Sequence, residues 1–254
     1  MSAALLAAAS CWVSDGLASA QVNTETLRLG QPEQGVHGSV KGDVSLRRGN
    51  VELFELGGDA KLFYQTGYHT PLVAVRAELG KQGGERFAEN AFVHARWTAM
   101  WLERLGTEVF GQVQYDSFVR LKFRTLIGAG PRAAVVVLDW LECFVGTGYM
   151  LEREVLKIPA TDSHPQTTLN HRSTTYAAIK VRLSPVLKLN NVTYLQPRFD
   201  HLRDVRVLEE LELELAATEQ IQVVNTFSMR LDSDPPDQVR KLDLGLTVGF
   251  RVGI

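Results

Sequence analysis

The sequence lacks the long apolar run of a membrane-spanning helix. After residue 20, no stretch of about 18 consecutive apolar residues occurs in the 254-residue chain, which excludes a helical membrane protein. An excess of one charge is also missing, because 27 Lys and Arg against 29 Asp and Glu give a net charge of -2. Nucleic acid is therefore not an expected partner. A membrane β-barrel stays open, since strands that alternate lipid-facing and lumen-facing side chains have neutral average hydropathy.

Basic residues are absent from the first part of the chain, where an export signal would carry them. Residues 3–13 are nevertheless apolar and small, and residues 18–20 (Ala-Ser-Ala) fit the small-x-small rule for cleavage. We therefore expect residues 1–20 to be a signal peptide and residues 21–34 a periplasmic segment. Cleavage after Ala20 would leave Cys143 as the one cysteine, so no intramolecular disulfide is expected.

What the chain has, from Gly35 onward, is alternation of apolar and polar residues. The last segment shows it most clearly, because Lys, Asp, Gly, Thr and Arg alternate with an apolar face. That face consists of Leu242, Leu244, Leu246, Val248, Phe250, Val252 and Ile254. A period of two indicates a β-strand with unlike faces. A strand of this length, tilted by about 45°, can cross an apolar layer of roughly 25 Å.

The same alternation recurs upstream and gives about twelve strands. Residues 207–222 are the ambiguous segment: they are rich in the helix formers Glu, Leu and Ala, but Glu210, Glu212 and Glu214 alternate strictly with leucines. We therefore predict a strand there, with a helix as the alternative. The expected fold is all-β, an antiparallel transmembrane up-and-down β-barrel over residues 35–254.

Three features favour a membrane barrel over a soluble one. The strands are near ten residues or longer, where soluble strands run about five or six. One face is almost free of charge over the centre of most strands. Aromatic residues lie near the proposed strand ends, as in the aromatic girdles of membrane barrels: Trp97, Trp101, Tyr115, Tyr149 and Phe250. The longer connections are the odd-numbered ones, which places them outside the cell.

Several motifs resemble the salt-induced outer-membrane proteins, a family of unknown function. They are Gly49-Asn50, Gly57-Gly58-Asp59-Ala60, the stretch from Gln114 to Gly130, and the turn Asp232, Ser233, Asp234, Pro235 and Pro236. The resemblance implies an outer-membrane β-barrel without catalytic residues or cofactor. It also implies contacts with membrane lipid, lipopolysaccharide and the barrel-assembly machinery. Phe250, Val252 and Ile254 would form the assembly signal, although this class commonly ends in Phe.

Charged residues on the inward face are the candidate functional site. A basic ladder and an acidic ladder are predicted, with further basic residues as partners: Arg120, Lys122, Arg124, Glu210, Glu212, Glu214, Lys180, Arg182 and Arg230. Like charges in such rows must be paired or hydrated, because an isolated buried ion costs too much. Either the ladders form an internal ion-pair network, or they line a water-filled path for small ions or solutes.

Three functions follow as hypotheses: a small passive pore, a closed structural barrel that serves the envelope under osmotic stress, and an enzyme at the barrel rim. The enzyme is the weakest, because Asp200, His201 and Asp204, or Asp232, Asp234 and Asp237, serve equally well as turn residues. His164 and His171 lack the spacing of a zinc site. We therefore expect no catalytic activity, no metal and no cofactor.

Overall fold

The computed structural model describes residues 34–47, 53–82, 85–117 and 119–253. The predicted signal peptide, nearly all of the segment 21–34, the Gly49-Asn50 turn and Ile254 lie outside the described residues. Among the residues described, no helix is long and apolar enough to cross a membrane. The described chain is instead built from β-strands, as the alternation predicts.

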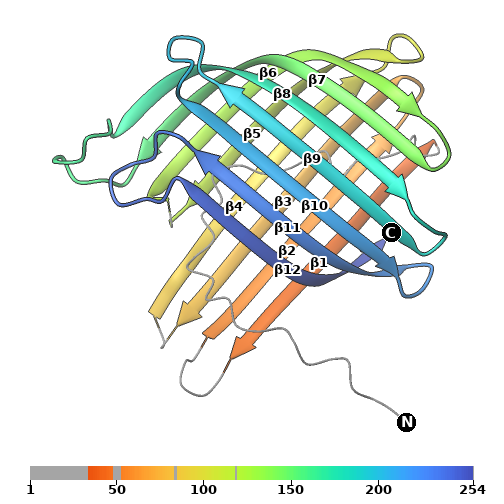
Figure 1. Ribbon diagram of the computed structural model, residues 1–254, viewed down its shortest axis with the longest axis horizontal. Helices are drawn as coiled ribbons and strands as arrows, with labels where there is room; N and C mark the ends of the chain where they lie inside the picture. Colours follow the sequence, from red (N-terminus) through yellow and green to blue (C-terminus); the bar gives the residue numbers. More distant parts are fainter. Residues whose placement is uncertain (1–33, 48–52, 83–84, 118, 254) are drawn as a thin grey trace.

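Twelve antiparallel strands form one closed barrel (Figure 1). They are β1 (Gly35–Arg47), β2 (Leu53–Gln65), β3 (His69–Gln82), β4 (Glu85–Ala99), β5 (Leu105–Asp116), β6 (Leu121–Val137), β7 (Leu141–Leu156), β8 (Thr167–Arg182), β9 (Leu187–Pro197), β10 (Val205–Ala216), β11 (Ile221–Asp232) and β12 (Leu242–Gly253). Each strand pairs with its sequence neighbours, and β1 pairs with β12 between Ser39–Gly42 and Gly253–Phe250. The prediction of an all-β antiparallel barrel of about twelve strands is confirmed.

The ambiguous segment is strand β10, paired along its length with β9 and β11. From Glu210 to Leu215 its glutamates alternate with leucines, so in this part of the strand one face is acidic and the other apolar. A helix would mix these residues around its axis, whereas the strand separates them between the two sides of the wall. Pairing on both sides therefore overrides the helix propensity of Glu, Leu and Ala.

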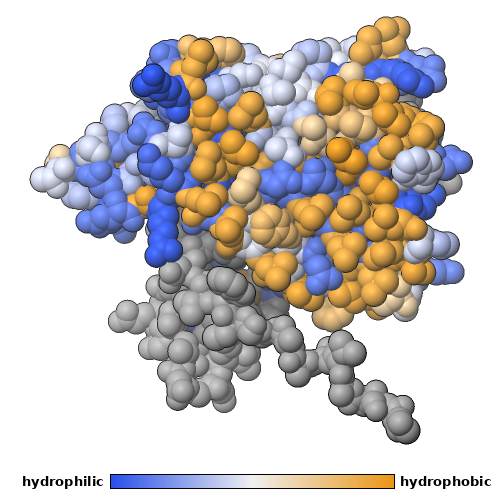
Figure 2. All heavy atoms as spheres, in the orientation of Figure 1, coloured by the Kyte–Doolittle hydropathy of each residue, from blue (hydrophilic) through white to orange (hydrophobic). Residues whose placement is uncertain are grey.

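The barrel is apolar outside and polar inside. Along β12 the outward side chains are strongly exposed, with Leu246 at 76% and Phe250 at 62%. Figure 2 shows the result as a largely hydrophobic surface over the strands. Many charged side chains point into the interior, and Arg172, Glu152, Glu154, Glu210 and Glu212 are among the most deeply buried residues.

Connection lengths differ between the two ends of the barrel. At one end, strands are joined by short turns such as residues 66–68 and 138–140. At the other end, residues 157–166 join β7 to β8, and residues 233–241 join β11 to β12. This asymmetry agrees with the predicted placement of long connections after odd-numbered strands, and we call this end the outer end.

Glycines in β6 and β7 make room for aromatic side chains in the lumen. A Cβ atom at Gly146 would lie within 3 Å of the Tyr176 ring, and one at Gly128 would lie within 3 Å of the Phe110 ring. The glycines of the 128–130 segment thus relieve crowding, as expected for strand glycines rather than for a phosphate loop.

Candidate functional site

Arg206 on β10 is the centre of the ion-pair network in the outer half of the lumen. Its guanidinium reaches β7, where Nη1 lies 2.5 Å from Glu152 Oε2 and Nη2 lies 3.0 Å from Glu154 Oε2. Its Nε lies 2.9 Å from Asp232 Oδ2 at the end of β11. Because β8 and β9 lie between β7 and β10 in the wall, Arg206 reaches these glutamates through the lumen.

Two further arginines extend the same network. Arg124 on β6 pairs with Glu154, and its Nε lies 3.6 Å from Glu152 Oε2. Arg172 on β8 places Nε 3.0 Å from Glu152 Oε1 and Nη2 3.0 Å from Asp204 Oδ1. Every carboxylate of this network therefore contacts at least one guanidinium, which offsets the cost of removing these charges from water.

A second network occupies the side formed by β10, β12 and β1. Arg251 pairs with Glu212 at 3.0 Å and also with Glu214. Lys41 on β1 donates a hydrogen bond to Thr226 Oγ1 at 3.0 Å and lies 3.6 Å from Glu212. Glu212 and Glu214 of the acidic row of β10 are thus paired with basic residues of strands on either side of the β1–β12 seam.

The inner half of the lumen, on the side of β4 to β10, is filled by aromatic and apolar side chains. Arg132 donates a hydrogen bond to Tyr176 OH at 2.6 Å, and its guanidinium lies 4.4 Å from the centre of the Phe144 ring. Tyr176 in turn donates to Glu108 at 3.1 Å. The apolar cluster around them contains Ala134, Phe144, Tyr176, Ala178, Val192, Tyr194 and Leu208.

Two small cavities lie among the described side chains of the lumen. One of about 40 Å³ lies among Lys41, Asp59, Arg76, Glu78 and neighbouring residues, and another of about 30 Å³ lies beside His94 and Tyr176. Each has room for a few water molecules rather than for an organic solute. Side chains thus fill much of the lumen at the levels of these networks.

A lid covers the outer end of the lumen. The β11–β12 connection meets the β7–β8 connection, where Ser163 Oγ and N donate to the Asp237 carboxylate at 2.6 and 3.1 Å. Arg120 donates to Gln238 at 2.7 Å and lies 3.7 Å from Asp162. Since β12 and β7 stand five strands apart, the connection crosses the opening to make these contacts.

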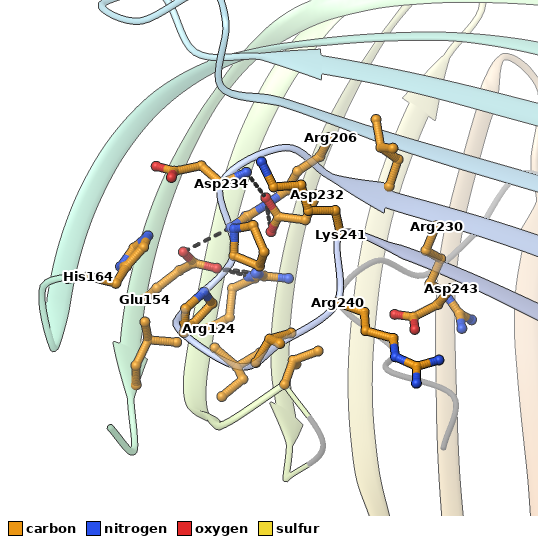
Figure 3. A pocket seen from close by; sticks show the side chains of 17 residues that line it. Arg124, Glu154, His164, Arg206, Arg230, Asp232, Asp234, Arg240, Lys241 and Asp243 are labelled. Carbon is orange, nitrogen blue, oxygen red and sulfur yellow. Dashed lines mark hydrogen bonds and ion pairs between the residues drawn. The ribbon is translucent and has the colours of Figure 1, made fainter. Parts of the chain in front are cut away.

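Beneath the lid is a pocket of about 30 Å³ (Figure 3). One wall is apolar, formed by Val119, Leu121 and Leu156 with Val239 of the lid, and Ile158 packs in the same apolar cluster. The facing wall is charged, and Figure 3 shows Arg124, Glu154, Arg206 and Asp232 converging there. Apolar packing and ion pairs therefore hold the lid over the outer network.

The carboxyl group of Asp237 in the lid is held as the anion. Its hydrogen bonds from the Ser163 side chain and backbone lower its pKa below the ordinary value of 3.8. The contact between the two connections is thus fully formed at neutral pH, because a carboxylate accepts both hydrogen bonds.

The structure places most of the predicted charge ladders inside the barrel. Glu210, Glu212, Glu214, Arg124 and Arg230 are buried in the lumen. Lys180 lies on the inward face of β8, 3.9 Å from Glu142, and Arg182 is exposed at the inner end of β8. The acidic row is therefore complete, and the basic partners come from several strands.

The basic ladder of β6 is corrected at two positions. Arg120 precedes the strand and belongs to the lid contacts, with a φ of 55°. Lys122 is exposed and does not face the lumen, because the pairing of β6 with β7 shifts between Leu121 and Phe123. This β-bulge turns Leu121 inward and Lys122 outward, and strict alternation cannot predict such a shift.

The predicted external turn lies in the lid. Asp232 accepts from Arg206, Ser233 Oγ accepts from Val205 N at 2.7 Å, and Asp234, Pro235 and Pro236 line the pocket below. Of the assembly-signal residues, Phe250 and Val252 are exposed on the outward face of β12. The role of these residues in barrel assembly stays a prediction.

Two carboxylates of the hypothetical rim enzyme, Asp200 and Asp204, are bound to Arg198. Hydrogen bonds from Arg198 lower the pKa of the Asp200 carboxyl, and Arg198 also donates to Asp204 at 3.1 Å. His201 is exposed between them. Within the described ranges, no group of three His, Cys, Asp or Glu side chains could hold a metal ion.

Sequence reasoning missed the centre of the network. Arg206, Arg172, Glu152 and Glu154 were not among the predicted lumen charges, although each follows the alternation of its strand. Both glutamates lie near the outer end of β7, which continues to Leu156. Extending the alternation through residues 152–156 would have placed both glutamates inside.

A family model matches residues 44–254, which is most of the chain and includes the lid and both networks except Lys41. The chain belongs to the DUF481 family. The family is described as proteins of unknown function, so the resemblance to salt-induced proteins remains a prediction. No curated protein matches the chain.

Solved structures similar to this DUF481 protein are also barrels. The NanC porin is 8% identical, with a TM-score of 0.49, over 85% of this chain and 97% of that one. The translocator domain of the autotransporter NalP from Neisseria meningitidis is 12% identical, with a TM-score of 0.45, over 90% of each chain. The KdgM porin, in complex with disordered oligogalacturonate, is 7% identical, with a TM-score of 0.44, over 86% and 99%.

Proposed function

We propose that this DUF481 protein is an outer-membrane β-barrel of a Gram-negative bacterium whose lumen is closed at rest. The outward apolar surface supports the membrane location. Leu244, Leu246 and Val248 on β12 are each more than half exposed, which in water would leave a large apolar surface unburied. In hydrocarbon the same surface is favourable, and a closed barrel leaves no unpaired sheet edge in the lipid.

The main support for a closed lumen is the ion-pair bridge from Arg206 on β10 to Glu152 and Glu154 on β7. An open pore keeps its charges at the wall, where water hydrates them. Here the guanidinium extends past β8 and β9 to reach β7, and the pocket above it holds only about 30 Å³. We therefore propose that this bridge and the side chains around it block the passage of a hydrated organic solute.

Planar-bilayer conductance tests this proposal. The refolded wild-type barrel is expected to show little current, whereas Arg206→Ala combined with Glu154→Ala removes a cation and an anion together and should give larger, more frequent steps. Arg182→Ala at the inner end of β8 is the matched control and should behave as the wild type. A wild-type conductance as large as that of the double variant would overturn the closed state.

A gated pore is the second candidate, favoured by the way the lid is attached. Apart from the Val239 contact, its link to the β7–β8 connection consists of polar groups at the rim, with Asp237 and Ser163 as the main pair. Ser163→Ala with Asp237→Ala should then increase opening events without changing the fully open current. If the double variant is as silent as the wild type, the lid is not the gate.

We also propose that the protein has no catalytic activity, since Asp200 and Asp204 are engaged by arginine. Lipid, lipopolysaccharide and the barrel-assembly machinery are the proposed partners, and an envelope role under osmotic stress is the proposed physiology. A deletion strain grown in high salt tests that role: rescue by the wild-type gene supports it, and unchanged growth of the deletion strain contradicts it.

A further inference from the structure

The outward face of β7 to β10 carries a row of polar side chains that the closed lumen does not explain. We define this polar seam as Thr147, Ser173, Thr175, Asn191 and Thr193, with Arg153 and Glu209 at its two edges. Figure 2 shows hydrophilic groups over the middle of β9 and β10, within a face that is otherwise largely apolar. Such polar groups are not expected on a surface that faces lipid.

Glu209 is held in this seam by hydrogen bonds. It lies between the outward residues Val207 and Leu211 of β10, and its two carboxylate oxygens accept hydrogen bonds from Asn191 and Thr193 of β9. The neighbouring strands continue the row, because Thr147 and Thr175 are joined by a hydrogen bond of 2.9 Å. Lipid tails offer neither donors nor countercharge, so an ionised carboxylate here calls for a cationic partner.

The same chain supplies a complementary charge on the other edge of the seam. Across the outward faces of β7 to β10, Arg153 and Glu209 are the two charged side chains. Arg153 lies three residues before the outer end of β7 at Leu156, and Glu209 lies four residues after the outer end of β10 at Val205. Both charges are thus near the outer end, on opposite sides of the seam.

We propose that the polar seam is the contact surface for a second copy of this chain, in a two-fold symmetric dimer. Two copies with the same orientation in the membrane are related by an axis along the membrane normal. If that axis runs beside β8 and β9, β7 of one copy faces β10 of the other. Arg153 of each copy then meets Glu209 of its mate, and the hydroxyl and amide groups between them are removed from lipid.

Charge reversal tests this inference on the full chain refolded in detergent, with the dimer dissociation constant measured by sedimentation equilibrium. Glu209→Arg and Arg153→Glu should each weaken the dimer by at least about tenfold, because each sets like charges against each other across the contact. The double variant Glu209→Arg with Arg153→Glu should restore the wild-type constant. Lys81→Glu on β3, at the opposite side of the barrel, should leave it unchanged.

A wild-type protein that stays monomeric at all concentrations overturns the inference. A dimer that Glu209→Arg leaves intact overturns it as well. A double variant as weak as the single ones overturns the pairing of Arg153 with Glu209. Heat-dependent electrophoretic mobility identifies variants that fail to fold, and the lumen conductance is independent of all these results, so the dimer and the closed lumen are tested separately.

Discussion

Replacing Arg206 by Met distinguishes a dry ion-pair network from a water-filled lumen. The substitution keeps an unbranched side chain but removes contacts to Glu152, Glu154 and Asp232 at 2.5, 3.0 and 2.9 Å. Breaking a buried pair by deleting one partner costs about 3–5 kcal/mol. Glu152 and Glu154 keep Arg124, and Glu152 also keeps Arg172, so the lower end of this range is expected: a loss of about 3 kcal/mol.

The assay is urea unfolding of the barrel refolded into phospholipid vesicles, followed by tryptophan fluorescence. If water filled the lumen, the same pairs would be screened and their loss would cost less than about 1 kcal/mol. Arg182→Met, at an exposed position, is the control and should change the free energy of unfolding little. A loss below about 1 kcal/mol for Arg206→Met refutes the dry network.

Three other perturbations have defined outcomes. Gly146→Val drives a side chain into the Tyr176 ring and should lower the free energy of unfolding by about 1–3 kcal/mol in the same assay, whereas a neutral result contradicts the packing. Leu246→Arg, at a position 76% exposed, should cost up to about 2–4 kcal/mol in vesicles, and no cost would place that face in water. The pKa of Asp237 lies below 3.8, so its contact with Ser163 is complete above that pH and is lost as the pH falls through the lowered pKa. Channel opening should therefore be constant from neutral to mildly acidic pH and rise only in strong acid, and a rise near neutral pH would contradict this assignment.

Alternation alone predicted the strands because a barrel wall separates two environments. Leu242 to Val252 on β12 could be assigned to the outward face from their spacing, and the glutamates of β10 to the lumen in the same way. Both assignments depend on a local period of two, which each strand carries in its own sequence. The strand count follows from the same signal.

Features that depend on departures from this period were not predictable. The bulge between Leu121 and Phe123 reverses the faces at the start of β6, so Lys122 was assigned to the wrong side. Partner choice is also non-local: the contact of Arg206 with Glu154 depends on barrel closure and stagger. The lid contact of Asp237 with Ser163 joins residues 74 positions apart, and no sequence signal links them.

The dependence of folding on lipid tests the central claim most directly. Trp97 is exposed on β4, and Trp101 and Trp140 are exposed in connections at the inner end, so bilayer insertion should bring them close to lipid. The purified chain should gain β-structure only with vesicles or detergent, and brominated lipid tails should quench its tryptophan fluorescence. A folded monomer in buffer without either, with no quenching when brominated vesicles are added, would contradict the account.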